Sequence, residues 1–313
     1  MVRSGIARAS VTDRSCSPMK ARHFFQLIAM SALWGASFPL LRIASPAFGP
    51  MALAGIRCAL AALVLALLMR MLRERWPARS TWLPLAALAL LTVVAPFVLF
   101  NWAALTLPAG YSAVLNATAP VFGVLGAAVA GDEKITTRSL LGCVAGFVGV
   151  ALLVQLGPVE ATPRVILAAV ACTAASACYG IGTIFMKRAS AQHPPLAAAA
   201  TIHIAAALML AIPVGVAVPT MLPSTGVWLA VAMLGLVTSG FMYWISMRLM
   251  REIPASSATS AAFMIPLFGV TWGGLFLGEP VTAGMLPGSL LILLATALIT
   301  GFNPLRLATR LRQ

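Results

Sequence analysis

Pro120-Val121-Phe122-Gly123-Val124 returns later in the same chain as Pro266-Leu267-Phe268-Gly269-Val270, shifted by 146 positions. The same shift brings further identical residues into register, namely Glu133 with Glu279, Thr136 with Thr282 and Gly142 with Gly288. Agreement along a stretch of this length indicates a duplicated half rather than a chance match. In a strongly apolar chain, duplicated halves are typical of secondary transporters.

The composition of the 313-residue chain places most of it in a lipid bilayer. Hydrophobic residues make up 61% of the chain, charged residues make up 9%, and the mean hydropathy is +0.98. So few charged side chains cannot cover the surface of a soluble protein of this size. The net charge of +14 would suit nucleic acid, but the basic residues cluster at the ends of apolar runs. We therefore expect a bilayer as partner and no nucleic acid.

Ten apolar runs each approach the roughly 20 residues that a helix needs to cross about 30 Å of hydrocarbon. They cover approximately residues 24–44, 49–70, 82–104, 109–130, 138–156, 163–186, 195–217, 226–248, 255–277 and 282–302. Helices are expected because they pair every backbone polar group within the segment. The runs are also too uniformly apolar for barrel strands. The predicted fold is an all-α integral membrane protein with ten transmembrane helices.

The basic residues predict the orientation of these helices. With the N-terminus inside the cell, cytoplasmic segments hold every Lys and Arg except Arg42, Arg57 and Arg164. Such a bias follows the positive-inside rule. Residues 1–23 and 303–313 are therefore predicted to be basic tails, both cytoplasmic.

The remainder divides into two repeats of five helices, residues 24–156 and 163–302. Because five is odd, the second repeat enters the membrane from the side opposite to the first. The sequence therefore predicts inverted repeats with a substrate site near the midplane between them.

Several short motifs recur in order along both halves. They are Trp34-Gly35-Ala36-Ser37-Phe38-Pro39, Arg42, Ala109-Gly110-Tyr111-Ser112-Ala113, Pro120, Gly131-Asp132-Glu133, Tyr179-Gly180, Lys187, Ala255-Ser256-Ser257-Ala258, Pro266 and Gly278-Glu279. This pattern resembles EamA-type members of the drug/metabolite transporter superfamily over nearly all of the chain after residue 23. Two features depart from this pattern. The second half has Tyr179 where the first half has Trp34, and the end of the fourth helix reads Gly-Asp-Glu in place of Gly-Glu.

The resemblance implies a ten-helix carrier of the bacterial inner membrane that exports amino acids or other metabolites. Two alternatives share the fold: an exporter of drugs or nucleosides, and an uptake carrier. A channel and a membrane-embedded enzyme are less favoured. The sequence offers no repeated pore ring, and its three histidines fall at different depths. The five cysteines form no C-x-x-C pair and are expected to be small buried residues, so we predict no metal site and no cofactor.

One helix face in each half is a candidate cavity wall. Trp34, Ser37, Phe38 and Leu41 share a face by their spacing, and a shift of 145 gives Tyr179, Gly182, Thr183 and Met186. Mixed aromatic, hydroxyl and small side chains suit a substrate cavity, although ordinary helix packing is the alternative. Further candidates for the cavity are Asn101, Asn116, Tyr243 and Trp272. The two amides have a competing interpretation as bridges between helices.

Arg57 and His203 are basic side chains that lie well inside their spans. Arg57, about 10 Å from the outer end of its helix, has three interpretations: snorkelling to the headgroups, tying two helices together, or pairing with a substrate carboxylate. His203 is interpreted as a neutral, hydrogen-bonded histidine in preference to a residue that couples protons to transport. No Asp or Glu lies near the middle of a run, which favours a neutral, zwitterionic or anionic cargo.

Prolines and glycines supply the last predictions. Pro120 and Pro266 are repeat mates and are predicted to be paired hinges, with static kinks as the alternative. Gly142 and Gly146 have the spacing of a helix-packing motif, with a homodimer contact as the weaker alternative. Together these features predict export of a small-molecule substrate by alternating access.

Overall fold

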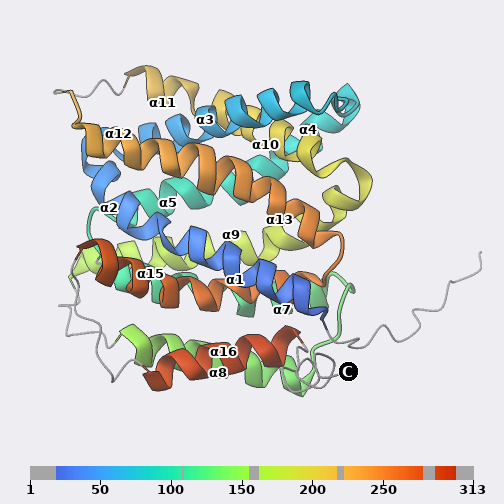
Figure 1. The fold of residues 1–313 in the computed structure, drawn as a ribbon, viewed down its shortest axis with the longest axis vertical. Helices are drawn as coiled ribbons and strands as arrows, with labels where there is room; N and C mark the ends of the chain where they lie inside the picture. The colour runs from blue at the N-terminus through green and yellow to red at the C-terminus, as the bar shows by residue number, and fades with distance from the viewer. Residues whose placement is uncertain (1–18, 108, 155–161, 217–221, 278–285, 301–313) are drawn as a thin grey trace, which may run out of the picture.

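The computed structural model describes residues 19–107, 109–154, 162–216, 222–277 and 286–300. All regular structure in these ranges is helical (Figure 1). Six helical segments are long and apolar enough to cross a membrane: Ala21–Phe48, Pro50–Met71, Arg79–Ala103, Tyr111–Val129, Pro163–Gln192 and Thr225–Met250. Shorter apolar helices cover Thr137–Leu152, Pro195–Met209 and Leu286–Thr300.

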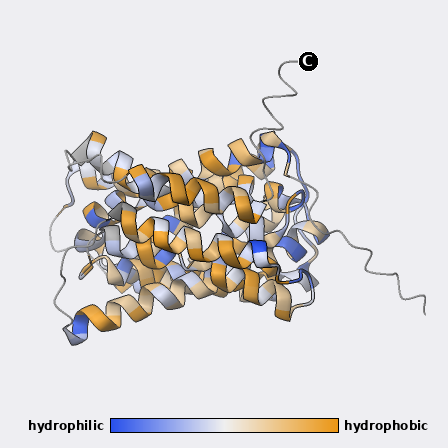
Figure 2. Cartoon of the chain, turned by 90° about the horizontal axis from the view of Figure 1, so that it is seen from below, coloured by the Kyte–Doolittle hydropathy of each residue, from blue (hydrophilic) through white to orange (hydrophobic). Residues whose placement is uncertain are grey.

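The helices run roughly along one direction, and polar residues gather mainly near their two ends (Figure 2). Many large apolar side chains along the outer faces are exposed, among them Leu63, Leu83 and Leu208. An apolar belt between two polar ends is the surface that a bilayer requires of a multi-pass membrane protein. The predicted all-α membrane class is thereby confirmed.

The described elements from Ala21 to Val154 include interrupted helices as well as continuous ones. Their bounds are α1 (Ala21–Gly35), α2 (Ser37–Phe48), α3 (Pro50–Met71), η1 (Arg79–Thr81), α4 (Trp82–Ala89), η2 (Leu90–Val94), α5 (Ala95–Ala103), α6 (Ala109–Asn116), α7 (Ala119–Val129) and α8 (Thr137–Val154). Proline begins or follows several of these pieces, because it cannot continue the hydrogen bonds of a preceding turn.

The described elements from Pro163 to Thr300 follow one another in a similar order. They are α9 (Pro163–Gln192), α10 (Pro195–Met209), α11 (Ala211–Val216), α12 (Thr225–Ala232), η3 (Met233–Phe241), α13 (Met242–Met250), α14 (Ala255–Thr259), α15 (Ala261–Leu277) and α16 (Leu286–Thr300). In Figure 1, α9 lies in the interior, while α8 and α16 lie together at the lower edge.

The two π-helical segments, η2 and η3, occupy equivalent places in the two halves. Thr92 in η2 and Thr238 in η3 are separated by the repeat shift of 146 positions. Each hydroxyl donates to the carbonyl four residues earlier, Thr92 to Leu88 at 2.8 Å and Thr238 to Leu234 at 2.9 Å. Single-turn π segments inside α-helices occur frequently at functional sites.

Glycines allow close contacts between helices of different halves. A Cβ added to Gly35 in α1 would lie 2.8 Å from Phe268 Cβ in α15. A Cβ added to Gly180 in α9 would lie 2.7 Å from Phe122 Cβ in α7. Phe122 and Phe268 are repeat mates, so each half packs a glycine against the equivalent phenylalanine of the other.

The predicted packing motif in α8 faces other helices of this chain. A Cβ on Gly142 would lie 2.5 Å from Ile299 in α16, and one on Gly146 would lie 2.6 Å from the Phe263 ring in α15. Both glycines are buried. These contacts agree with the interpretation as intramolecular packing, while the homodimer stays a prediction.

The predicted hinge prolines occupy different local positions. Pro120 lies in the first turn of α7, immediately after the break that separates α6 from α7. Pro266 lies inside α15, several residues after the break at Ser260. The hinge role itself stays a prediction.

Candidate functional site

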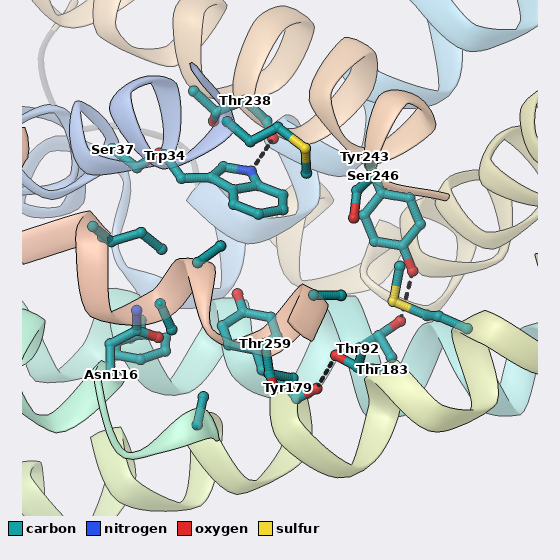
Figure 3. Close-up of a pocket in the computed structure, with 18 of the residues that line it drawn as sticks. Trp34, Ser37, Thr92, Asn116, Tyr179, Thr183, Thr238, Tyr243, Ser246 and Thr259 are labelled. Carbon is teal, nitrogen blue, oxygen red and sulfur yellow. Dashed lines mark hydrogen bonds between the residues drawn. The ribbon is translucent and has the colours of Figure 1, made fainter. Parts of the chain in front are cut away.

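A cavity with about 170 Å³ of space for water-sized molecules lies among helices of both halves (Figure 3). Its walls are largely apolar and carry six aromatic side chains: Trp34, Phe38, Phe97, Phe100, Tyr179 and Tyr243. The polar lining residues are Ser37, Arg57, Thr92, Asn116, Thr183, Thr238, Ser246 and Thr259. Apolar walls with a few convergent polar groups are typical of a small-molecule site.

Most of the side chains predicted from the sequence line this cavity. These are Trp34, Ser37, Phe38, Arg57, Asn116, Tyr179, Thr183 and Tyr243. The two predicted wall segments, in α1–α2 and in α9, therefore face one shared space. Whether these residues bind a substrate stays a prediction.

An aromatic stack forms one wall. The Tyr179 ring lies parallel to the Phe100 ring, with 5.9 Å between centroids and an interplanar angle of 17°. Phe38 meets the same Phe100 ring edge-on at 6.1 Å. Such contacts fix ring orientation, because stacked and edge-to-face pairs match the ring quadrupoles. The three rings therefore hold one another in defined orientations along this wall.

Each π-helical segment is linked to an aromatic side chain from the other half. Trp34 donates its indole N–H to the backbone carbonyl of Thr238 at 3.1 Å. Thr92 and Tyr243 place their hydroxyl oxygens 2.8 Å apart. Both links are visible as dashed lines in Figure 3. The cavity is thus bounded by hydrogen bonds that cross between the halves.

Arg57 is buried in the interior rather than extended toward the headgroups, with 5% of its surface exposed. Its guanidinium carbon lies 4.0 Å from the centroid of the Phe97 ring, a cation–π distance. Nη2 donates to Ser239 Oγ at 3.2 Å, and Nη1 reaches Asn101 Oδ1 at 3.5 Å. Among the described residues that line the cavity, Arg57 is the only charged one.

Three predicted residues lie outside the cavity lining and support its walls. Asn101 donates to the Pro50 carbonyl at 2.9 Å, which turns its own carbonyl oxygen toward Arg57. Trp272 in α15 donates its indole N–H to the Ala32 carbonyl in α1 at 2.7 Å. An amide or an indole buried in lipid needs a partner, and here each finds a backbone carbonyl.

His203 also lies behind the wall. Its Nδ1 is 3.0 Å from the Ala199 carbonyl, and its ring meets Tyr243 edge-on with 4.6 Å between centroids. The side chain is fully buried, and its Nε2 has no hydrogen-bond partner among the described residues. His203 thus contacts a residue of the cavity wall, Tyr243.

Some lining residues were not predicted from the sequence. They include Thr92, Phe97, Phe100, Thr238, Ser246 and Thr259. The repeat shift of 146 pairs Thr92 with Thr238 and also pairs Phe97 with the predicted Tyr243. Comparison of the two halves at this shift draws attention to Thr92, Thr238 and Phe97, but not to Thr259, whose repeat mate is Ala113.

Residues 251–256, called the 251–256 loop below, comprise the connection after α13 and the first two residues of α14, and they lie in the chain between the lining residues Met250 and Ala258. Glu133 accepts a hydrogen bond from the Ala255 backbone N–H at 2.9 Å and another from the Ser256 hydroxyl. Lys187 in α9 donates to the Ile253 carbonyl. The Glu133 carboxylate thereby satisfies free N–H groups at the start of α14 and suits its dipole.

The start of α1 contacts the same loop. Arg22 forms an ion pair with Glu252, and His23 Nε2 lies 2.9 Å from the same carboxylate. The hydrogen bond with His23, together with the positive charge of Arg22, holds the pKa of the Glu252 carboxyl below its usual value. The 251–256 loop is therefore held by groups from α1, from α9 and from the segment between α7 and α8.

A small void of about 10 Å³ adjoins the cavity and shares Phe38, Leu41 and Phe100 with it. This void leads to Arg42, whose side chain is exposed.

Comparison with known proteins gives two matches to one family model, the EamA-like transporter family, at residues 23–155 and 166–301. The "Uncharacterized inner membrane transporter YedA" of Escherichia coli is 27% identical over 263 residues, which are 83% of this chain and 84% of that protein. An "Uncharacterized transporter" of Archaeoglobus fulgidus is 25% identical over 85% of this chain and 94% of its own.

Another relative, the "Probable terminal-alkyne amino-acid exporter" of Streptantibioticus cattleyicolor, is 33% identical over 132 residues. This alignment covers 42% of the present chain and less than half, 44%, of that protein. One solved crystal structure superposes with a TM-score of 0.75 over 94% of this chain and 100% of its own, at 16% identity. That likeness bears on the fold alone.

Proposed function

Because this chain belongs to the EamA-like transporter family, we propose that it is a secondary transporter that exports small metabolites by alternating access. It is a multi-pass membrane transporter and not an enzyme, as its family and its relatives' names state. The observation that carries the proposal is the cavity to which both matched regions contribute aromatic and polar side chains.

We propose ten spans arranged as two inverted repeats, residues 24–156 and 163–302. The six long segments and three shorter helices supply nine, and α14 with α15 supplies the tenth. Reciprocal contacts support the symmetry, because Gly35 packs on Phe268 as Gly180 packs on Phe122. Each pair of equivalent residues lies 145 or 146 positions apart.

We place both termini in the cytoplasm of a bacterial cell, with the protein in the inner membrane. The start of α1 and the 251–256 loop share one end of the molecule through Arg22 and Glu252. Arg138 at the start of α8 donates to Ala297 near the end of α16. Basic residues concentrate at this end, which the positive-inside rule assigns to the cytoplasm.

We propose that in this arrangement the 251–256 loop closes the cavity on the cytoplasmic side, because it connects the lining residues Met250 and Ala258. Release of its contacts with Glu133 and Lys187 would let the halves rock and open the cavity inward. We assign the hinges of this motion to Pro120 at the start of α7 and Pro266 within α15. Two packings of nearly equal free energy are what alternating access requires.

The substrate class that we propose is amino acids or related small polar metabolites. The S. cattleyicolor relative carries the name of an amino-acid exporter, which supports this class. The cavity lining agrees, because aromatic walls and scattered hydroxyl groups suit a small molecule with one apolar part.

Reconstitution into liposomes tests the proposal. A carrier gives saturable uptake of a labelled amino acid, and unlabelled substrate trapped inside accelerates that uptake. Ohmic current would identify a channel instead. A thermal-shift screen of metabolites defines the substrate class, because a ligand that binds the folded form raises its melting temperature. Stabilisation by nucleosides or aromatic drugs but by no amino acid would contradict the proposed substrate.

A further inference from the structure

Arg57 presents an unusual electrostatic situation, a buried guanidinium without an acidic partner among the described residues. The described ion pairs involve Glu252 and Asp132, and neither of these carboxylates pairs with Arg57. Arg57 is one of the residues that line the cavity, and its side chain is almost fully buried. Burying a charge is costly unless it is paired and hydrogen-bonded.

The contacts that Arg57 makes within the protein leave much of its hydrogen-bonding capacity unused. A guanidinium has five N–H donors. Ser239 accepts one of them, the contact with Asn101 is long at 3.5 Å, and Nε has no partner among the described residues. Both acceptors are neutral, so neither offsets the charge. A ligand with an anionic acceptor would complete this site.

Resting on the transport function proposed above, we propose that Arg57 binds the carboxylate of a substrate whose remaining part is apolar or aromatic. The planar fork of Arg matches a carboxylate in a bidentate pair. Phe97 beneath the guanidinium fixes its plane, and Asn101 and Ser239 hold two of its donors. The substrate tail then faces the aromatic walls that Trp34, Phe100 and Tyr179 form.

The charges around the cavity define the ligand further. One described lining cation balances one negative charge, which fits a monocarboxylate better than a phosphate dianion that needs more donors. The described lining contains no carboxylate to pair with an ammonium group. The carboxylate is therefore the group that the site requires, and an α-amino group is tolerated rather than required.

The first experiment varies the ligand and needs no mutant. Binding to the purified full-length protein is measured by thermal shift and by calorimetry with 3-phenylpropionate, its amide and L-phenylalanine, and with 4-methylpentanoate, its amide and L-leucine. We expect the acids and amino acids to bind and each amide to bind roughly 10- to 100-fold more weakly. The inference is overturned if the acids stabilise the protein no more than the amides do, or if the acids do not stabilise it at all.

The second experiment varies the protein. Arg57→Lys keeps the charge but loses the planar fork, and Arg57→Gln loses both. We expect carboxylate affinity to fall in both variants, further in Arg57→Gln, with amide affinity unchanged. Arg164→Gln is the matched control, because Arg164 is exposed at the start of α9. If folded Arg57→Gln binds the carboxylates with wild-type affinity, the inference is overturned. If Arg57→Gln does not fold, the comparison of acids with amides on the wild-type protein tests the inference instead.

The outcomes separate this inference from the transport function. Liposomes that transport the acid and its amide equally well would retain the carrier but reject Arg57 as a carboxylate site. Selective binding of acids without transport of any panel compound would retain Arg57 as a carboxylate site but reject the transport function.

Discussion

The hydroxyl groups of Thr92 and Tyr243 lie 2.8 Å apart and join the two halves beside the cavity. Thr92 uses its only hydroxyl hydrogen toward the Leu88 carbonyl at 2.8 Å, so Tyr243 is the donor of the pair. The link connects the π-helical segment η2 to the start of α13, which follows the equivalent segment η3. A change in the angle between the halves would strain or break it.

Tyr243→Phe is expected to lower the free energy of unfolding by roughly 0.5–1.5 kcal/mol, the net value of one hydrogen bond. Thr92→Val is expected to cost more, about 1–3 kcal/mol, because it leaves the buried Tyr243 hydroxyl without its acceptor. Denaturant unfolding in detergent measures both effects. The double variant should cost less than the sum of the single variants, and strict additivity would contradict a direct coupling.

Gly35→Ala and Gly180→Ala are each expected to destabilise the protein by about 1–3 kcal/mol, because the added Cβ overlaps a neighbouring helix. The closest atoms would be Phe268 Cβ at 2.8 Å and the Ala119 carbonyl oxygen at 2.5 Å, respectively. Gly226→Ala in α12 is the control, since its Cβ would meet only Ser224 Oγ at 3.9 Å. Equal melting temperatures for the three variants would argue against close packing of the halves.

Glu133→Gln is expected to loosen the cytoplasmic end of the cavity. The substitution weakens the hydrogen bonds to Ala255 and Ser256, and 1–2 kcal/mol shifts a two-state population roughly 5- to 30-fold. The readout is labelling of Ser246→Cys, a lining position, by an impermeant thiol reagent applied to everted vesicles. Faster labelling is expected with Glu133→Gln and not with the exposed control Arg75→Gln. Unchanged rates would mean that the 251–256 loop does not close the cavity.

Acid is expected to weaken the contact between α1 and the 251–256 loop. The pKa of Glu252 is lowered in the folded protein by His23 and Arg22, so the unfolded carboxyl binds a proton more readily. The stabilisation is therefore complete above the unfolded pKa of about 4.3 and is lost as the pH falls through the lower folded value. The difference in melting temperature between wild type and Glu252→Gln should shrink between pH 6 and pH 3. A difference independent of pH would contradict this assignment.

Sequence reasoning located a large part of the cavity because the cavity wall repeats. Trp34 and Ser37 in the first half, and Tyr179 and Thr183 in the second, share helix faces that a fixed shift relates. It did not find Thr92, although Thr238 is its repeat mate, because a π-helical turn changes the direction in which later side chains point. Helical periodicity alone therefore misplaces residues near η2 and η3.

A polar side chain within an apolar run predicts that the side chain has a hydrogen-bond partner. It does not predict whether that partner lies in the cavity or on a neighbouring helix. Asn101 and Trp272 are cavity candidates from the sequence, with a bridge between helices as the alternative for Asn101. Each donates to a carbonyl of a neighbouring helix, Pro50 and Ala32 respectively. The breaks within spans were equally hidden. The apolar run at 24–44 gives no sign that α1 ends at Gly35, where Phe268 packs closely. Such features depend on tertiary contacts that one sequence does not display.

His203 is expected to stabilise the wall without coupling protons to transport. Its Nδ1 meets the Ala199 carbonyl and its ring supports Tyr243, so His203→Ala should leave a void and cost roughly 2–5 kcal/mol. The pH dependence of transport should persist in this variant, as in the control His193→Ala at the end of α9. Counterflow in liposomes across pH 5.5–8 measures this pH dependence in both variants. Loss of the pH dependence in His203→Ala alone would instead make His203 the coupling residue, in contact with the cavity wall at Tyr243.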